Sequence, residues 1–261
     1  MPRPHSKACI AAALFALLAA GCDGIATAPA AQESAAPRER LGLMTSLPLY
    51  WPLGAGVEDI ASGRAAVPWQ RAALERAFVL EPLDTLSPIP GLTPDAPETD
   101  PLAGLTRLAV IQPRGLSPAD NVALDDWVRG GGRLLLVLDP FLTGDYDLPL
   151  GDPRRPADTA LIPPVVARWG LEVNYAAEGA EEGAADLPGG IALPFAQAGQ
   201  IAILPEGTDD CTLAGKHALV ATCRIEKGTV TLIADAAVFE HPESAGEGGA
   251  ILRQLVGQML P

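Results

Sequence analysis

From residue 41 onward, apolar runs of strand length alternate with segments whose apolar residues recur at helical spacing. The runs expected to form strands are 41–49, 79–83, 105–112, 133–138, 171–175, 191–193, 201–204, 219–225 and 229–234. Helices are expected over 69–78, 118–129 and 158–169, and in a last segment that places Ile251, Leu252, Leu255, Val256 and Met259 on one face. This alternation favours an α/β fold with a largely parallel central sheet, to which the hairpin at 219–234 adds antiparallel strands late in the chain.

The helix at 118–129 has the clearest boundaries. Ser117 is a suitable N-cap, Pro118 suits the first helical position, and the three glycines at 130–132 can end the helix. The run at 133–138 that follows is apolar throughout, which is typical of a strand covered on both faces. Two segments are expected to be loops: the proline-rich 88–101 and the acidic, Gly/Ala-rich 176–190. Ser244 and Glu247 have the spacing of a capping box ahead of the last helix.

The first 22 residues have the pattern of an export signal. Arg3 and Lys7 form a basic start, and residues 8–20 are an apolar run that is too short to span a membrane. The run ends in Gly21-Cys22, which resembles the bacterial lipobox, and that resemblance implies acylation of the Cys22 thiol after cleavage. The alternative is an ordinary secretory signal that is cut nearby, with an incidental Cys22.

The signal peptide (1–22) precedes a segment, 23–40, that is rich in Ala and Pro and has no periodicity, so it is expected to be a flexible tether. Residues 41–261 are then expected to form a single α/β domain. These features predict a lipid-anchored protein of the bacterial cell envelope that faces the periplasm. Asp23 directly after the cysteine resembles a signal for retention in the inner membrane, which slightly favours that membrane.

Composition narrows the classes of function. The 261 residues include 18 Lys+Arg and 32 Asp+Glu, for a formal net charge of −14, which disfavours a nucleic-acid binder. In an oxidising compartment Cys211 and Cys223 are expected to form a disulfide across a hairpin, the alternative being two buried thiols. The sequence contains no CxxC or HExxH spacing, so no metal site is expected. No cofactor is expected either.

Residues 105–140 carry a family resemblance. The segment LSPADNVALDDWVRGGG and a following strand that closes in Asp139-Pro140 are similar to the auxiliary domain of Gld-type gliding-motility and uncharacterised ABC-transport proteins. Segments 167–173 and 228–235 are similar to two further landmarks of that family. The resemblance implies a flavodoxin-like three-layer sandwich related to class I glutamine amidotransferases. It also implies a membrane permease and an ATPase as partners.

The related enzymes place a cysteine nucleophile at the turn after a central strand. Here that turn reads Leu138-Asp139-Pro140-Phe141, with neither Cys nor Ser, and the chain has no GxSxG elbow. A P-loop and a GxGxxG motif are also absent from the sequence. The resemblance therefore argues against amidotransferase activity.

Open α/β sheets bind ligands beyond the carboxyl ends of their strands. The candidate residues there are Ser46, Tyr50, Trp51, Arg114, Asp139 and Asp235. Aromatic rings with two acids suit a sugar or another small polar ligand. The alternative is structural, with both aspartates capping neighbouring loops and both rings filling the edge of the core.

Two classes of function follow. The first is a membrane-tethered, non-catalytic accessory or binding module of an envelope or ABC-type transport system. The second is an envelope hydrolase that acts on a sugar or an ester through Asp139, Asp235 and His241, which would require a nucleophile. The missing nucleophile and the family resemblance favour the first.

Overall fold

The computed structural model describes residues 38–93, 95–175, 182–205 and 210–260. The signal peptide, the lipidation site Cys22 and most of the predicted tether lie outside these residues. Arg38–Pro261 form one compact unit. The first strand already starts at Glu39, inside the segment predicted as tether.

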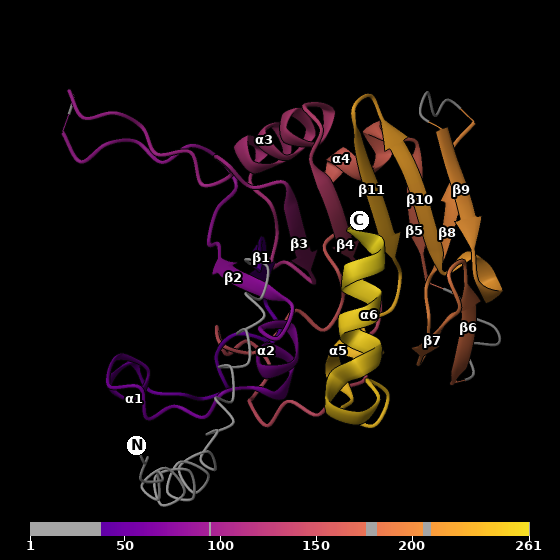
Figure 1. Cartoon of the computed structure of the whole chain (residues 1–261), viewed down its shortest axis with the longest axis horizontal. Coiled ribbons are helices and arrows are strands. Elements are labelled where there is room, and N and C mark those ends of the chain that lie inside the picture. The colour runs from indigo at the N-terminus through magenta and orange to yellow at the C-terminus, as the bar shows by residue number, and fades with distance from the viewer. Residues whose placement is uncertain (1–37, 94, 176–181, 206–209, 261) are drawn as a thin grey trace, which may run out of the picture. The chain divides into compact units, whose positions relative to one another are not determined.

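A seven-stranded sheet with the spatial order β2-β1-β3-β4-β11-β10-β9 forms the centre of this unit (Figure 1). In chain order its strands are β1 (Glu39–Thr45), β2 (Phe78–Pro82), β3 (Arg107–Ile111), β4 (Arg133–Val137), β9 (Asp210–Ala214), β10 (Val220–Ile225) and β11 (Gly228–Ile233). The pairs among β2, β1, β3, β4 and β11 are parallel, whereas β10 pairs antiparallel with both β11 and β9. The predicted α/β class with a mostly parallel sheet is confirmed.

The central strands are buried along nearly their whole length. Four consecutive side chains of β4, Leu134 to Val137, are 0% exposed, as an apolar strand covered on both faces requires. The helices around the sheet are α2 (Trp69–Leu74), α3 (Pro118–Arg129), α4 (Pro164–Arg168) and α6 (Ala250–Met259). Helix α2 packs on α6, and α3 packs on α4. Helix α6, in yellow, lies in front of the sheet beside β4 (Figure 1).

Helix α3 begins and ends where the sequence predicts. The Ser117 hydroxyl accepts a hydrogen bond from the backbone N–H of Asp120 at 3.0 Å, and the Asp120 carboxylate accepts one from the N–H of Ser117 at 3.1 Å. The two bonds form a capping box.

The other helix boundaries differ from prediction. Helix α2 ends at Leu74, because the chain must be extended again at Phe78 to pair with β1. Helix α4 starts only at Pro164, because residues 157–160 form hydrogen bonds with the ends of the central strands instead. The capping box predicted at Ser244 is wrong: Gly249, with φ +73°, caps α6, and no side chain contributes.

Two small sheets complete the described chain. Strand β5 (Leu171–Asn174) pairs with β8 (Gln200–Ile203), and β6 (Gly183–Leu187) pairs with β7 (Ile191–Phe195). The loop predicted at 176–190 is wrong over β6, where Ala185 and Leu187 are buried against the core. Four short helical turns were not predicted: α1 (Val57–Ala61), α5 (Ala237–Glu240), η1 (Lys216–Ala218) and η2 (Glu247–Gly249).

The predicted disulfide is present. Cys211 in β9 lies directly opposite Cys223 in β10, with their Cα atoms 4.0 Å apart, and the two are bonded. The bond joins the outermost strand of the sheet to its neighbour. Among the residues described, no helix is long and apolar enough to cross a membrane.

Candidate functional site

Side-chain hydrogen bonds tie the carboxyl ends of β1, β3 and β4 together. The Ser46 hydroxyl, just after β1, donates to the carbonyl of Gln112 at 2.5 Å. The Gln112 side chain accepts from the backbone N–H of Asp139 at 2.8 Å and donates to the carbonyl of Asp139 at 3.0 Å. Gln112 is fully buried with φ +45°, a conformation uncommon for a residue other than glycine. These bonds close the gap between the strand ends.

Asp139 and Asp235 follow the neighbouring strands β4 and β11 and are 0% and 2% exposed. All four carboxylate oxygens accept backbone N–H groups at 2.8 Å, with Phe141 and Ala236 donating to Asp139, and Ala237 and Ala196 donating to Asp235. The two carboxylates therefore position the loops that leave the strands. Neither reaches solvent.

Burial also changes the protonation of this pair. Loss of hydration raises the pKa of Asp139 to about 7. Loss of hydration, and then repulsion by the Asp139 carboxylate, raise the pKa of Asp235 to about 8. The backbone N–H groups oppose the rise but do not cancel it. Near neutral pH the pair therefore retains a proton.

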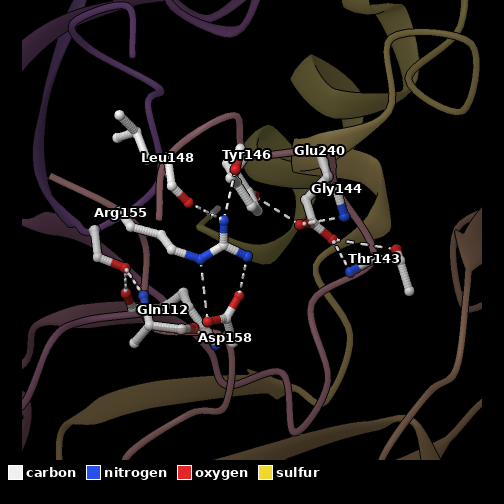
Figure 2. Close-up of polar contacts among 10 residues, drawn as sticks. Gln112, Thr143, Gly144, Tyr146, Leu148, Arg155, Asp158 and Glu240 are labelled. Carbon is white, nitrogen blue, oxygen red and sulfur yellow. Dashed lines mark hydrogen bonds and ion pairs between the residues drawn. The ribbon is translucent and has the colours of Figure 1, made fainter. Parts of the chain in front are cut away.

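Residues 139–160, called the strap here, lie over these strand ends, and Glu240 anchors the first part of the strap. Its carboxylate accepts hydrogen bonds from the backbone N–H of Thr143 at 3.2 Å and of Gly144 at 2.9 Å, and from the Tyr146 hydroxyl at 2.6 Å (Figure 2). The Thr143 hydroxyl also donates to this carboxylate at 3.3 Å.

Arg155 holds the rest of the strap. Its guanidinium donates to the carbonyls of Tyr146 and Leu148 and pairs with the Asp158 carboxylate at 2.7 Å (Figure 2). The Gln112 side chain donates to the carbonyl of Ala157 at 2.9 Å. The strap is therefore fixed to the strand ends, and it covers the place where an open α/β sheet ordinarily binds its ligand.

An open cavity of about 270 Å³ remains at the carboxyl ends of β1 and β2. Three predicted residues, Ser46, Tyr50 and Trp51, line it. Apolar side chains contribute to its wall, and Thr45, Asp84 and Arg154 add polar groups. The cavity lies on the β2 side of β1, whereas the order of the parallel strands reverses between β1 and β3.

Ring and ion-pair contacts position the aromatic side of the cavity. The rings of Tyr50 and Trp51 meet edge to face, with centroids 4.9 Å apart. The Arg71 guanidinium carbon lies 4.1 Å from the centroid of the Tyr50 ring and 5.2 Å from that of Trp51. Arg71 is in turn held by Glu75 at 2.7 Å. The side chain of Trp51 nevertheless stays 43% exposed.

The structure thus brings together only part of the predicted cleft. Asp139 and Asp235 are buried, and Arg114 is exposed but does not line the cavity. Asp84 and Arg154 were not among the predicted residues, because both lie in loops whose course no periodic pattern reveals. The one available signal for Asp84 was its place just after the strand predicted at 79–83.

His241 lies in a second cavity, of about 420 Å³, that it lines together with Thr143 and Glu243. Its Nε2 atom is 2.9 Å from the Thr143 hydroxyl, and its Nδ1 atom is 3.7 Å from a Glu243 carboxylate oxygen. Asp235 does not line this cavity. In the described ranges, no group of three or more His, Cys, Asp or Glu side chains is arranged to hold a metal ion.

No protein-family model matches the chain, and no curated protein matches it. The solved structures that match most of its length include the following three. They are exo-β-1,4-mannosidase Op5Man5 from Opitutaceae bacterium strain TAV5 (12% identity, TM-score 0.46, 86% of this chain), the mmIFT52 N-terminal domain (10%, 0.47, 85%) and a β-galactosidase from Rahnella sp. R3 (12%, 0.45, 86%). The match covers 96% of the mmIFT52 domain, but only 36% of the mannosidase and 32% of the galactosidase.

Proposed function

We propose that this protein is a membrane-tethered, non-catalytic binding module of a bacterial envelope or ABC-type transport system, and that the cavity at Ser46, Tyr50 and Trp51 is its binding site. The observation that carries the proposal is the contrast between two places at the same end of the sheet. The cavity is open and lined by an exposed tryptophan, whereas Asp139 and Asp235 at the other strand ends are buried.

The proposal includes a flavodoxin-like fold of the kind found in class I glutamine amidotransferases. Its support is the order of the five parallel strands, β2-β1-β3-β4-β11, which is the flavodoxin-like order 2-1-3-4-5. In that order the usual ligand site lies between β1 and β3, where the winding reverses. The hydrogen bond from Ser46 to Gln112 closes the β3 side of β1, which leaves the β2 side for a ligand.

The absence of catalysis is inferred from the chemistry at the strand ends. On the proposed family resemblance, Asp139 takes the position of the cysteine nucleophile, and both oxygens of its carboxylate already accept backbone N–H groups. Cys211 and Cys223 are bonded to each other and supply no thiolate nucleophile. The proposed partners are a permease and an ATPase of the same envelope system, together with a small polar ligand.

Two experiments test this proposal. Any permease and ATPase found to be encoded beside this gene would be co-expressed with the full chain, and complex formation would be measured after purification through the permease. Trp51→Ala is expected to weaken the complex, whereas Phe141→Ala, which removes an exposed ring outside the cavity, leaves it unchanged. Equal capture by wild type and Trp51→Ala would refute the assignment of this cavity.

The tether is tested separately by Cys22→Ser. The substitution removes the thiol that would be acylated, so the protein is expected to move from the membrane fraction to the soluble fraction. A Cys22→Ser protein that fractionates with membranes as wild type does would contradict the lipid anchor. Detergent extraction of the wild-type protein, followed by mass spectrometry of its N-terminal peptide, would identify the acyl chains directly.

A second candidate function is an envelope hydrolase acting on an ester or a sugar. It is favoured by one observation, the contact of the Thr143 hydroxyl with His241 in the second cavity, with Glu243 on the other side of the ring. Hydrolysis of p-nitrophenyl acetate that is lost in His241→Ala and Thr143→Val, but kept in the control Thr159→Val, would favour this candidate. Background hydrolysis equal in all four proteins would reject it.

A further inference from the structure

We propose that the ligand of the cavity at Tyr50 and Trp51 is a single neutral sugar ring, recognised through its hydroxyl groups. This inference rests on the proposed binding function and assigns the class of ligand to the same site.

The polar groups of the cavity offer a ligand both hydrogen-bond donors and hydrogen-bond acceptors. Within the described part of the chain, the Trp51 indole N–H, the Tyr50 hydroxyl and the Asp84 carboxylate have no hydrogen-bond partner. An indole N–H only donates, an ionised carboxylate only accepts, and a phenol hydroxyl does both. A ligand that binds all three groups must carry hydrogen-bond donors and hydrogen-bond acceptors within a few ångströms of one another. Neighbouring hydroxyl groups do this.

The charges around the cavity disfavour a charged ligand of either sign. A cation would meet the positive groups of Arg71 and Arg154, and the carboxylate of Asp84, which could attract it, is exposed to water, which weakens that attraction. Glu75 and Asp152 already pair with these two arginines. An anion would therefore find no unpaired positive partner and would be repelled by Asp84. A neutral ligand avoids both penalties.

The size and walls of the cavity favour one ring. Its volume of about 270 Å³ is just below the range of roughly 300–1,000 Å³ typical of sites for drug-sized ligands. Partly exposed apolar residues of the wall such as Leu53 and Leu83, together with the exposed Trp51, offer surfaces for the C–H faces of a pyranose. The further rings of a longer oligosaccharide would have to extend into solvent through the open side of the cavity.

The test uses the detergent-solubilised full chain and five probes of similar shape. Glucose, galactose and mannose are neutral, glucosamine is a cation, and glucuronate is an anion. Binding would be followed by saturation-transfer NMR and by tryptophan fluorescence, in which Trp51 is the most exposed of the four tryptophans. At least one neutral sugar is expected to bind about tenfold or more tightly than both charged probes.

Two variants and two controls connect binding to the cavity. Trp51→Ala and Asp84→Asn are each expected to weaken binding of the neutral sugar tenfold or more in the NMR titration. Phe141→Ala and Asp147→Asn, which change an exposed ring and an exposed acid outside the cavity, are expected to leave it unchanged. Unchanged binding in Trp51→Ala and Asp84→Asn would place the sugar elsewhere and overturn the inference.

Failure of the inference can be told apart from failure of the proposed function. Tighter binding of glucosamine or glucuronate overturns the neutral class while it keeps the cavity as a binding site. No binding of any probe, combined with loss of the permease complex in Trp51→Ala, overturns the sugar ligand but not the binding module. No binding together with an intact complex in Trp51→Ala overturns both.

Discussion

The carboxylate of Asp139 accepts a hydrogen bond at 2.8 Å from the backbone N–H of Ala236, the residue that directly follows Asp235. This bond joins the end of β4 to the end of β11. Because both partners are buried, a substitution that breaks the bond leaves an unsatisfied group away from water. The main role of Asp139 and Asp235 is therefore structural: their carboxylates hold the ends of β4 and β11 and the loops that follow together.

Asp139→Asn is expected to lower the free energy of unfolding by about 1–3 kcal/mol. An amide nitrogen cannot accept a hydrogen bond, so one of the two N–H donors to Asp139 loses its partner. Chemical denaturation of the variant beside Asp145→Asn, which changes an exposed acid of the strap, would measure the difference. A folded, equally stable Asp139→Asn protein that captures its partners but has lost its biological function would favour the hydrolase instead.

Stability is expected to fall as the pH rises from 5 to 8. Burial raises the pKa values of Asp139 and Asp235 above 3.8, the ordinary value for aspartate. Between pH 4 and the raised pKa values the folded state holds protons that the unfolded state has lost, so each pH increase favours unfolding. Urea midpoints measured at pH 5, 6, 7 and 8 test this, and Asp235→Asn should show a flatter dependence. An equally steep dependence in Asp235→Asn would assign the effect to other groups.

Below pH 4 the opposite trend is expected, and Asp120 is one of the carboxyl groups with a lowered pKa that cause it. Burial raises the pKa of this carboxyl, but hydrogen bonds from Ser117, Thr85 and the backbone N–H groups of Leu86 and Ser87 outweigh burial and hold the pKa well below its usual value. The stability that Asp120 contributes is present above pH 4 and is lost as the pH falls. Together with the acid pair, this places the stability maximum near pH 4–5.

Ser117→Ala is expected to cost about 1 kcal/mol of stability, because the first turn of α3 loses its side-chain acceptor. Ser244→Ala is the matched control. Ser244 has the spacing of a capping residue in the sequence but caps no helix, so its removal should change the urea midpoint little. Equal losses in the two variants would contradict the assignment of both helix ends.

Gly228→Ala is expected to destabilise the domain by about 3 kcal/mol. A methyl group at this position would lie 2.0 Å from the carbonyl oxygen of Val128 and 2.5 Å from that of Gly132. The control is Gly257→Ala inside α6, where a methyl group meets no atom within 4 Å and should stabilise the helix by about 0.5–1 kcal/mol. Thermal denaturation of both variants measures the two opposite shifts.

Reduction of the bond between Cys211 and Cys223 is expected to lower the free energy of unfolding by about 3 kcal/mol without abolishing the fold. The domain keeps its own core, in which β10 and β11 remain paired. The Cys211→Ala/Cys223→Ala double variant should have the same midpoint with and without reductant. Thiols that alkylate in the unreduced wild-type protein would show that the bond does not form.

The sequence predicts the central strands well because their apolar runs have no alternative to burial. Leu134 to Leu138 have the pattern expected of a covered strand, and Ser117 with Pro118 is a typical helix start. Strand β6 was missed because Gly183, Ala184 and Ala185 carry little side chain, so its burial depends on pairing with β7. Local pattern cannot report such long-range pairing.

Only part of the candidate site could be predicted, again because the sequence does not show contacts between distant segments. Ser46, Tyr50 and Trp51 follow one strand closely, so chain connectivity alone places them at its end. Asp139 and Asp235 follow strands equally closely, but their exposure depends on the strap, which Glu240 and Arg155 hold through contacts far apart in sequence. No pattern in the sequence predicts those contacts.

The pairing of β4 with β11 also has a consequence for folding. Arg133 pairs with Thr229 and Val137 with Ile233, so the middle of the sheet stays incomplete until the last part of the chain is available. Such distant pairing makes folding slow compared with local helix formation. Until then the apolar edge of β4 is open to any other extended chain. Fragments that end before residue 228 should therefore aggregate, and the full chain should gain from a chaperone that shields this edge during synthesis.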